Sequence, residues 1–186
     1  MTIIGITGTL GAGKGTVVKY LESKGFAHYS ARSLITREIE KRGMPVNRDS
    51  MNLVARDLRA THSPSYIAET LYDEAVQNGK NAIIESLHTE GEVQALRSKG
   101  NFLLFAVDAD PELRYKRIVA RASATDDVSF EKFRADEARE MHGSDPTKQN
   151  LARCIELADH RLTNNGSMDD LYAQVDAILH GIMSTQ

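Results

Sequence analysis

The sequence predicts a three-layer α/β fold, in which a parallel sheet of five strands lies between layers of helices. Three observations predict it. Short β-like runs alternate with helical patterns along the chain, which is typical of parallel sheets with right-handed crossovers. A glycine-rich loop joins the first expected strand to the first expected helix. The 186 residues, 41% of them hydrophobic, are enough to bury the core of one domain.

Five short runs are rich in apolar residues and lie between turn residues, so we interpret them as strands. Four of them are apolar enough to be central strands covered on both faces, and the fifth is weaker. The expected strands are Ile3–Thr7, Ala27–Ser30, Asn81–Glu85, Phe102–Val107 and His160–Thr163.

Helical patterns fill the intervals, and several have end signals. Asp110 is followed by Pro111, a cap residue and then proline at the first helical position. Ser167 is followed three positions later by Asp170, as in a capping box. The expected helices are Gly15–Lys24, Ala31–Arg42, Ser50–Arg59, Ser65–Asn78, Glu90–Ser98, Pro111–Arg121, Ser129–Met141, Lys148–Asp159 and a last one that begins at Ser167.

Composition excludes several classes of function. The net charge of −3 argues against a protein that coats nucleic acid. No apolar stretch is long enough to span a membrane, and the first residues lack the pattern of a signal peptide, so we expect a cytoplasmic protein. The single cysteine, Cys154, lies in a helical pattern, and we interpret it as a small core residue rather than a nucleophile.

The glycine-rich loop, residues 8–16 (GTLGAGKGT), has the spacing of a P-loop and the required place between a strand and a helix. Its glycines let consecutive backbone N–H groups face an anion, and the helix N-terminus adds its dipole. Lys14 supplies a positive charge for the β and γ phosphates of ATP. The alternative is a glycine-rich turn without a ligand. The residues predicted to bind the nucleotide here are Gly8, Thr9, Leu10, Gly11, Ala12, Gly13, Lys14, Gly15 and Thr16.

One position departs from the general motif. The residue after the lysine is usually Ser or Thr and contacts Mg²⁺, but here it is Gly15, with Thr16 next. We therefore expect Mg²⁺ to be held largely through water, or by Thr16 and an acid elsewhere. Glu85, at the end of the third expected strand, is the natural acid. Its alternative role is that of a helix cap or a solvated surface group.

The GKGT form of the loop resembles that of adenylate kinase and other nucleoside monophosphate kinases. Further stretches are similar to the acceptor site, the third strand and the lid entry of these enzymes: HYSARSLITRE (28–38), AIIESLHTEGEV (82–93) and DADPELRYKRIVAR (108–121).

The segment ADHRLTNNGSMDDL (158–171) resembles the C-terminal strand and purine-side loop of dephospho-coenzyme A kinases and of an archaeal family related to adenylate kinase. That archaeal family resembles nearly the whole chain, including TDDVSFEKFRADEARE (125–140). The P-loop is the only highly specific motif among these similarities.

The resemblance implies roles for several residues and regions. Residues 31–78 would form a helical acceptor-binding region, and residues 121–128 a short lid whose closure excludes water. Arg117 and Arg121, four apart on one helix, would close on the donor phosphates and neutralise negative charge on the phosphoryl group during its transfer. An alternative for each arginine is an ion pair with a nearby aspartate. The backbones of Asn164 and Gly166 would face the donor adenine.

The acceptor site departs from the adenylate kinase pattern. The family's aspartate falls on Ser33, and its two phosphate-binding arginines fall on Thr36 and His88. Neither Thr nor neutral His replaces the two parallel hydrogen bonds of a guanidinium. His88 lies where ligands bind in such folds, as a base, a phosphate contact or an ordinary surface residue. Other arginines then become the candidates, although a solvated charged face is the alternative: Arg32, Arg37, Arg56 and Arg59.

The sequence as a whole predicts a single-domain P-loop NTPase fold, residues 1–186, acting as a monomer or homodimer. We expect it to transfer the γ-phosphoryl group of ATP, with Mg²⁺, to a nucleoside monophosphate or similar acceptor. Two alternatives remain. One is a dephospho-coenzyme A kinase, suggested by the C-terminal segment. The other is a nucleotide-binding regulator or slow NTPase without an acceptor, suggested by Ser33, Thr36 and His88.

Overall fold

A computed structural model describes residues 1–121, 129–143 and 149–184 of the chain. Within these ranges, strands and helices alternate as the sequence predicts. The strands are β1 (Ile3–Gly8), β2 (Ala27–Ser30), β3 (Ala82–Glu85), β4 (Phe102–Asp108) and β5 (His160–Thr163).

The five strands form one sheet in the order β2-β3-β1-β4-β5, and every neighbouring pair is parallel. This confirms the predicted fold class. The central strand, β1, has Ile84 of β3 opposite Gly5 on one side and Leu104 of β4 on the other. Because all strands run the same way, their carboxyl ends meet at one edge, where β1 leads into the P-loop.

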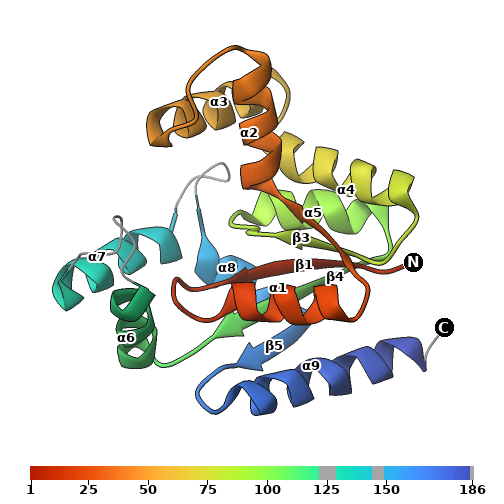
Figure 1. Cartoon of the computed structure of the whole chain (residues 1–186), viewed down its shortest axis with the longest axis vertical. Helices are drawn as coiled ribbons and strands as arrows, with labels where there is room; N and C mark the ends of the chain where they lie inside the picture. The colour runs from red at the N-terminus through yellow and green to blue at the C-terminus, as the bar shows by residue number, and fades with distance from the viewer. Residues whose placement is uncertain (122–128, 144–148, 185–186) are drawn as a thin grey trace.

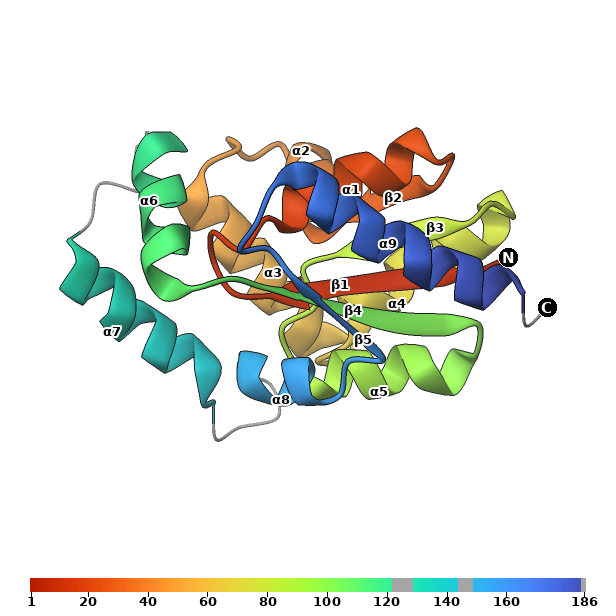
Figure 2. The ribbon, with the colours of Figure 1, turned by 90° about the horizontal axis from the view of Figure 1, so that it is seen from below.

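Helices cover both faces of this sheet. Figures 1 and 2 show α1 and α9 on one face, with α4, α5 and α8 on the opposite face. The helices are α1 (Lys14–Ser23), α2 (Ala31–Lys41), α3 (Arg48–Thr61), α4 (Tyr66–Asn78), α5 (Glu90–Lys99), α6 (Pro111–Arg121), α7 (Phe130–Met141), α8 (Leu151–Glu156) and α9 (Met168–Met183).

The sheet divides the core into two apolar clusters. All six residues of β1 are buried, and successive side chains point to opposite faces. Ile3 packs in the cluster under α2, α3, α4, α5 and α8, whereas Ile4 and Ile6 pack in the cluster under α1 and α9. Burial of each such side chain contributes about 2 kcal/mol to the stability of the fold. The well-packed sheet therefore holds the loops at its carboxyl edge in fixed positions.

Three sequence expectations need correction. The prediction of β2 as a central strand is wrong: β2 pairs only with β3, at the sheet edge, and His28 is exposed. Its four residues include too few aliphatic side chains to fill two faces. Helix α3 begins at Arg48, before the expected Ser50, because Asn47 accepts a hydrogen bond from the Ser50 backbone N–H. Helix α8 begins at Leu151, later than expected, because Asn150 caps it, and it ends at Glu156 rather than Asp159.

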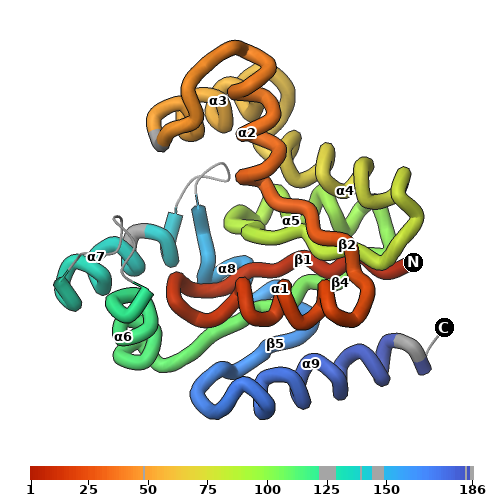
Figure 3. The backbone as a smooth tube through the Cα atoms, in the orientation of Figure 1, coloured from red at the N-terminus to blue at the C-terminus, as the bar shows by residue number. Residues whose placement is uncertain are grey.

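The helical segments outside the sheet layers lie near its carboxyl edge. The tube in Figure 3 shows α2 and α3 projecting on one side, and α6 and α7 on another. The turn from β1 into α1 lies beside α6 in Figures 1 and 2. The predicted lid falls on residues 121–128, of which 122–128 lie outside the described residues. In the described part of the chain, none of the helices has the length and apolar character needed to cross a membrane.

Candidate functional site

The P-loop occupies the turn between β1, which ends at Gly8, and α1, which begins at Lys14. Gly8 and Gly13 have φ values of 133° and 104°, which favour glycine. A Cβ on Gly8 would lie 2.0 Å from the carbonyl oxygen of Val107, and one on Gly13 would lie 2.3 Å from Nδ2 of Asn164. Glycine is therefore required at both positions by conformation and by space.

Lys14 folds back over this loop. Its Nζ donates to the carbonyl oxygens of Gly8, at 2.7 Å, and Thr9, at 2.9 Å. Burial lowers the pKa of Lys14 to about 8, although the negative charge of Glu85 opposes that shift. The side chain therefore remains mostly charged at neutral pH, and a bound phosphate would raise its pKa and favour the charged form further.

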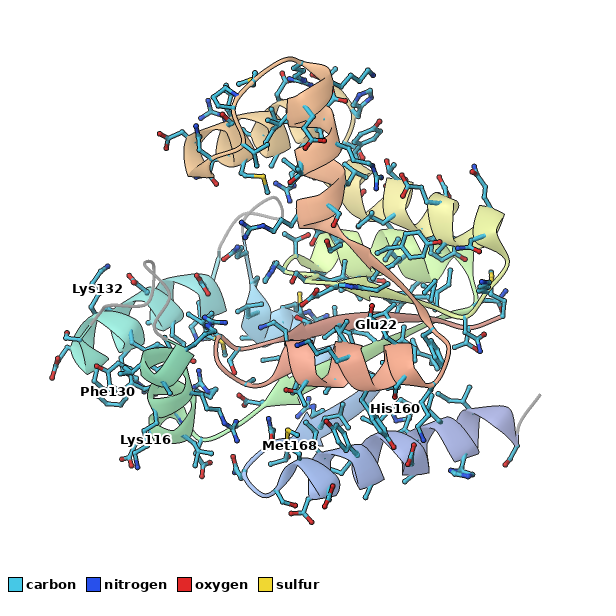
Figure 4. The ribbon with its side chains drawn as sticks, in the orientation of Figure 1. Glu22, Lys116, Phe130, Lys132, His160 and Met168 are labelled. Carbon is cyan, nitrogen blue, oxygen red and sulfur yellow. The ribbon has the colours of Figure 1, made fainter. Side chains whose placement is uncertain are left out.

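A cavity of about 520 Å³ lies over the loop. It brings together Lys14, Glu85 at the end of β3, and Arg117 and Arg121 of α6. Lys19 of α1 also lines it and was not predicted, because nothing in the sequence shows that its side chain faces the loop. Lys116, next to Arg117, is exposed on the outer side of α6 (Figure 4). The cavity thus gathers the cations and the acid that the sequence assigned to phosphate and metal binding.

Glu85 is ionised and held by a histidine. Its Oε2 lies 2.9 Å from Nε2 of His28 on β2. Nδ1 of His28 lies 3.8 Å from Glu22, which Figure 4 labels on α1. The hydrogen bond from His28 holds the pKa of Glu85 below its usual value, and the same bond raises the pKa of His28. The carboxylate is therefore charged and oriented at neutral pH.

Arg114 ties the loop to α6 and α7. Only 3% exposed, it donates from Nε to the Ala109 carbonyl at 2.7 Å and from Nη1 to the Leu10 carbonyl at 3.3 Å. It also forms an ion pair with Glu137 of α7. Sequence reasoning missed Arg114, because its place in a helix does not show that its side chain is buried.

Asn164 holds the P-loop on a second side and also binds Arg117 of α6. Arg117 Nη2 donates to the Asn164 carbonyl at 2.9 Å, and Asn164 Nδ2 donates to the Ala12 carbonyl at 2.8 Å. Arg117 Nη1 is buried without a hydrogen-bond partner among the described residues. Gly166, predicted with Asn164 to face the adenine, is exposed in the turn before α9. Asn164 therefore links the P-loop, α6 and the loop after β5.

His88 lies three residues beyond β3, and its Nδ1 is buried without a hydrogen-bond partner in the described ranges. Burial, together with the positive charges of Lys14 and Arg59, lowers the pKa of His88 to about 4. Arg59 of α3 reaches the same loop, since its Nη2 is 3.8 Å from Oε1 of Glu92, whose Oε2 accepts from the His88 N–H. The structure brings these two predicted acceptor residues together.

The other predicted acceptor arginines lie elsewhere. Arg56 lines a hollow of about 370 Å³ on α3 together with Arg59. Arg37 forms a 2.6 Å ion pair with Glu74 of α4, in a separate hollow. Arg32 is exposed in the first turn of α2. Arg59 is thus the member of this set that shares a neighbour, Glu92, with His88.

Cys154 has the role that the sequence indicates. It is fully buried in the core cluster under α5 and α8, and burial raises the pKa of its thiol to about 12. A thiol with so high a pKa is a poor nucleophile at neutral pH. The prediction of a core residue is confirmed.

The residues predicted to hold a metal meet at the cavity, since Thr16 and Glu85 both line it. In the part of the chain that the structure describes, no three His, Cys, Asp or Glu side chains gather in a metal-binding cluster. Mg²⁺ does not need such a cluster in nucleotide sites, because it binds one or two protein oxygens, phosphates and water. One hydroxyl and one ionised carboxylate fit this pattern.

This fold and site define a class of protein. A parallel sheet, a glycine loop with a buried lysine, an acid after the neighbouring strand and arginines on a later helix are the parts of a P-loop kinase-like domain. The family described as an AAA domain matches residues 4–142. The chain belongs to this family.

Known relatives and solved structures align with nearly the whole chain. A UPF0200 protein from Thermococcus kodakarensis is 26% identical over 188 residues, which cover 98% of each chain. The crystal structure of TT1252 from Thermus thermophilus has a TM-score of 0.63 at 24% identity and covers 97% of each chain. The dephospho-CoA kinase from Campylobacter jejuni has a TM-score of 0.60 at 14% identity, covering 97% of this chain and 96% of its own. These two structures share the fold.

Proposed function

We propose that the protein transfers the γ-phosphoryl group of ATP to a nucleoside monophosphate or similar nucleotide acceptor. The observation that carries this proposal is the single cavity that joins the P-loop, Glu85 and two arginines of α6. Phosphoryl transfer needs positioning and stabilisation of spread negative charge more than covalent chemistry from the protein. The cavity supplies donors and cations of that kind.

The donor would lie along the P-loop. Backbone N–H groups of the loop and the N-terminus of α1 would bind its phosphates. Lys14 would exchange the carbonyl oxygens of Gly8 and Thr9 for phosphate oxygens. Arg117, whose Nη1 is buried without a described partner, and Arg121 would contact the transferred group. The purine would lie toward Asn164 and Gly166, as the resemblance implies.

Thr16 and Glu85 are the residues that would hold Mg²⁺, largely through water. Bound there, the ion would neutralise charge on the β and γ phosphates. His28 keeps Glu85 ionised and fixes its orientation for this role. The fit depends on the hydroxyl and the carboxylate lining one cavity.

In the transfer step, an acceptor oxygen would attack the γ phosphorus in line with the bond to the leaving ADP. The new oxygen–phosphorus bond forms as the bond to the β-phosphate oxygen breaks and ADP leaves, and a dianionic phosphate acceptor attacks with an unprotonated oxygen, so that no proton is transferred. The acceptor would approach from the side of α2, α3 and α4, residues 31–78. No covalent enzyme intermediate is required.

The test is a coupled assay for ADP with ATP and Mg²⁺, in the presence of ribo- and deoxynucleoside monophosphates, dephospho-coenzyme A or no acceptor. Turnover that requires one monophosphate supports the proposal. Turnover only with dephospho-coenzyme A, or ADP release at the same rate without acceptor, contradicts it. Lys14→Ala should abolish transfer, whereas Lys80→Gln, at an exposed position before β3, is the charge-matched control.

A further inference from the structure

We infer that Arg59 and His88 form the subsite for an anionic phosphate group of the acceptor, and that Glu92 positions Arg59 there. The inference rests on the proposed function and narrows its acceptor to a phosphomonoester. In the adenylate kinase pattern that the sequence resembles, the position of His88 holds a phosphate-binding arginine. Here Arg59 of α3 would supply the guanidinium instead.

Glu92 joins two elements at this place. It is 5% exposed and belongs to the capping box of α5, where its Oε2 accepts from the backbone N–H groups of His88, at 3.0 Å, and Thr89, at 3.2 Å. Its other oxygen, Oε1, lies 3.8 Å from Arg59 Nη2. The carboxylate therefore holds the loop that carries His88 and attracts the guanidinium of α3.

A second capping box in the same chain shows that capping alone does not require this arrangement. Asp170 caps α9 by accepting from the backbone N–H of Ser167 at 2.9 Å, as Glu92 does for Thr89. Asp170 is exposed, whereas Glu92 is buried beside an arginine. A buried carboxylate is costly without a cation. The pairing of Glu92 with Arg59 thus places a cation at the sheet edge.

A buried ring nitrogen of His88 supports the subsite independently of the Glu92–Arg59 pair. Its backbone is fixed on both sides, because its N–H donates to Glu92 and its carbonyl accepts from the Asn150 N–H at 2.8 Å. Its Nδ1 is buried but has no hydrogen-bond partner among the described residues. Buried polar atoms are nearly always paired, so a ligand oxygen would complete this one.

The charges around His88 select an anion. Lys14 and Arg59 act on the imidazole as positive neighbours, and Glu85 is the opposing negative one. The 3.8 Å separation of Arg59 and Glu92 is an ion-pair distance too long for a hydrogen bond. The guanidinium can therefore turn its N–H groups to phosphate oxygens. A phosphomonoester can accept hydrogen bonds from both the guanidinium and the ring nitrogen and balances the guanidinium charge, which an uncharged hydroxyl does not.

The experiment uses sulfate as the probe, because it stays doubly charged over the working pH range. The full chain is first titrated with ADP by calorimetry, which tests the donor site. Sulfate is then added to ADP-saturated protein, and the His88 ring resonances are followed by ¹H–¹⁵N NMR. We expect a saturable shift, with an affinity reduced about tenfold or more in Arg59→Gln and in Glu92→Gln. Lys80→Gln is the matched control, with unchanged affinity.

The outcomes separate the two proposals. Unchanged His88 resonances in ADP-saturated protein, or equal sulfate affinity in Arg59→Gln, would overturn this inference and leave the donor site intact. Failure to bind ADP would instead contradict the proposed function, while the sulfate titration is still measured on the unliganded chain. Because Arg59 is partly exposed, its variant should fold, and circular dichroism verifies this for all three proteins.

Discussion

The side-chain amide of Asn164 donates a 2.8 Å hydrogen bond to the main-chain carbonyl of Ala12, so the loop after β5 holds the P-loop from the side. Asn164 is 7% exposed. Its own carbonyl accepts from Arg117 of α6, which lines the cavity. One buried residue therefore fixes both the loop and an arginine of the candidate site.

Asn164→Ala removes this link. The Ala12 carbonyl would lose its partner, so we expect a loss of about 1–3 kcal/mol in the free energy of unfolding. ADP affinity should fall as well, because the loop loses its lateral support. Urea unfolding and calorimetry measure the two effects. Asn165→Ala is the control, since exposed Asn165 exchanges hydrogen bonds with Asp110 rather than with the P-loop. Equal losses in both variants would contradict the assigned role.

Gly13→Ala should disrupt the contact between Asn164 and the P-loop by a change within the loop itself. Gly13 has a φ of 104°, and an added Cβ would lie 2.3 Å from Asn164 Nδ2. We expect a loss of stability above 1 kcal/mol and weakened ADP binding. Gly181→Ala in α9 is the matched substitution, because no atom lies within 4 Å of its Cβ position and its φ is ordinary. That change should stabilise the chain by about 1 kcal/mol. In thermal unfolding, we expect the melting temperature to fall in Gly13→Ala and to rise in Gly181→Ala.

The sequence predicts the fold well because its periodic patterns reflect burial. Alternation of apolar runs with helical patterns gave every strand and its approximate bounds, and the loop spacing placed Lys14 at the sheet edge. The position of β2 was not predictable in this way. The low aliphatic content of β2 agrees with an edge position, but the order of strands in the sheet depends on packing between elements, which four residues do not fix.

The arginines show where prediction of the site reaches its limit. Arg37 and Arg59 are both helical and both expected in the acceptor region, yet one pairs with Glu74 and the other turns toward Glu92. Arg114 was not predicted, although it is the arginine that ties the loop to α7. Side-chain partners arise from tertiary packing, which spacing along one helix does not specify.

ADP affinity should fall at alkaline pH because Lys14 loses its charge. Its pKa in the free protein is about 8, below the usual 10.5. Since a bound phosphate favours the charged form, the dissociation constant should rise above about pH 8, by up to about tenfold per pH unit. Calorimetry across this range measures the change. Lys14→Arg remains charged there, so its affinity should vary little, and a parallel decline in this variant would contradict the role of Lys14.

His88 should make the protein less stable in acid. Its folded pKa is about 4, whereas the unfolded value is near 6.5. Because the unfolded chain then binds more protons between these values, stability rises with pH in that window and is lost as pH falls from about 6.5 toward 4. Between about pH 7 and pH 5, we expect His88 to account for a loss of about 2 kcal/mol.

The comparison of wild type with His88→Gln isolates this contribution from that of His28. The pKa of His28 is raised, so its stabilising contribution is present at low pH and is lost as pH rises. The two histidines therefore act in opposite directions, and only their sum appears in wild type. His88→Gln retains a polar group without a titrating proton, so its urea midpoint should decline less between about pH 7 and pH 5. If the two midpoints declined in parallel, His88 would not be neutral and desolvated in the folded chain.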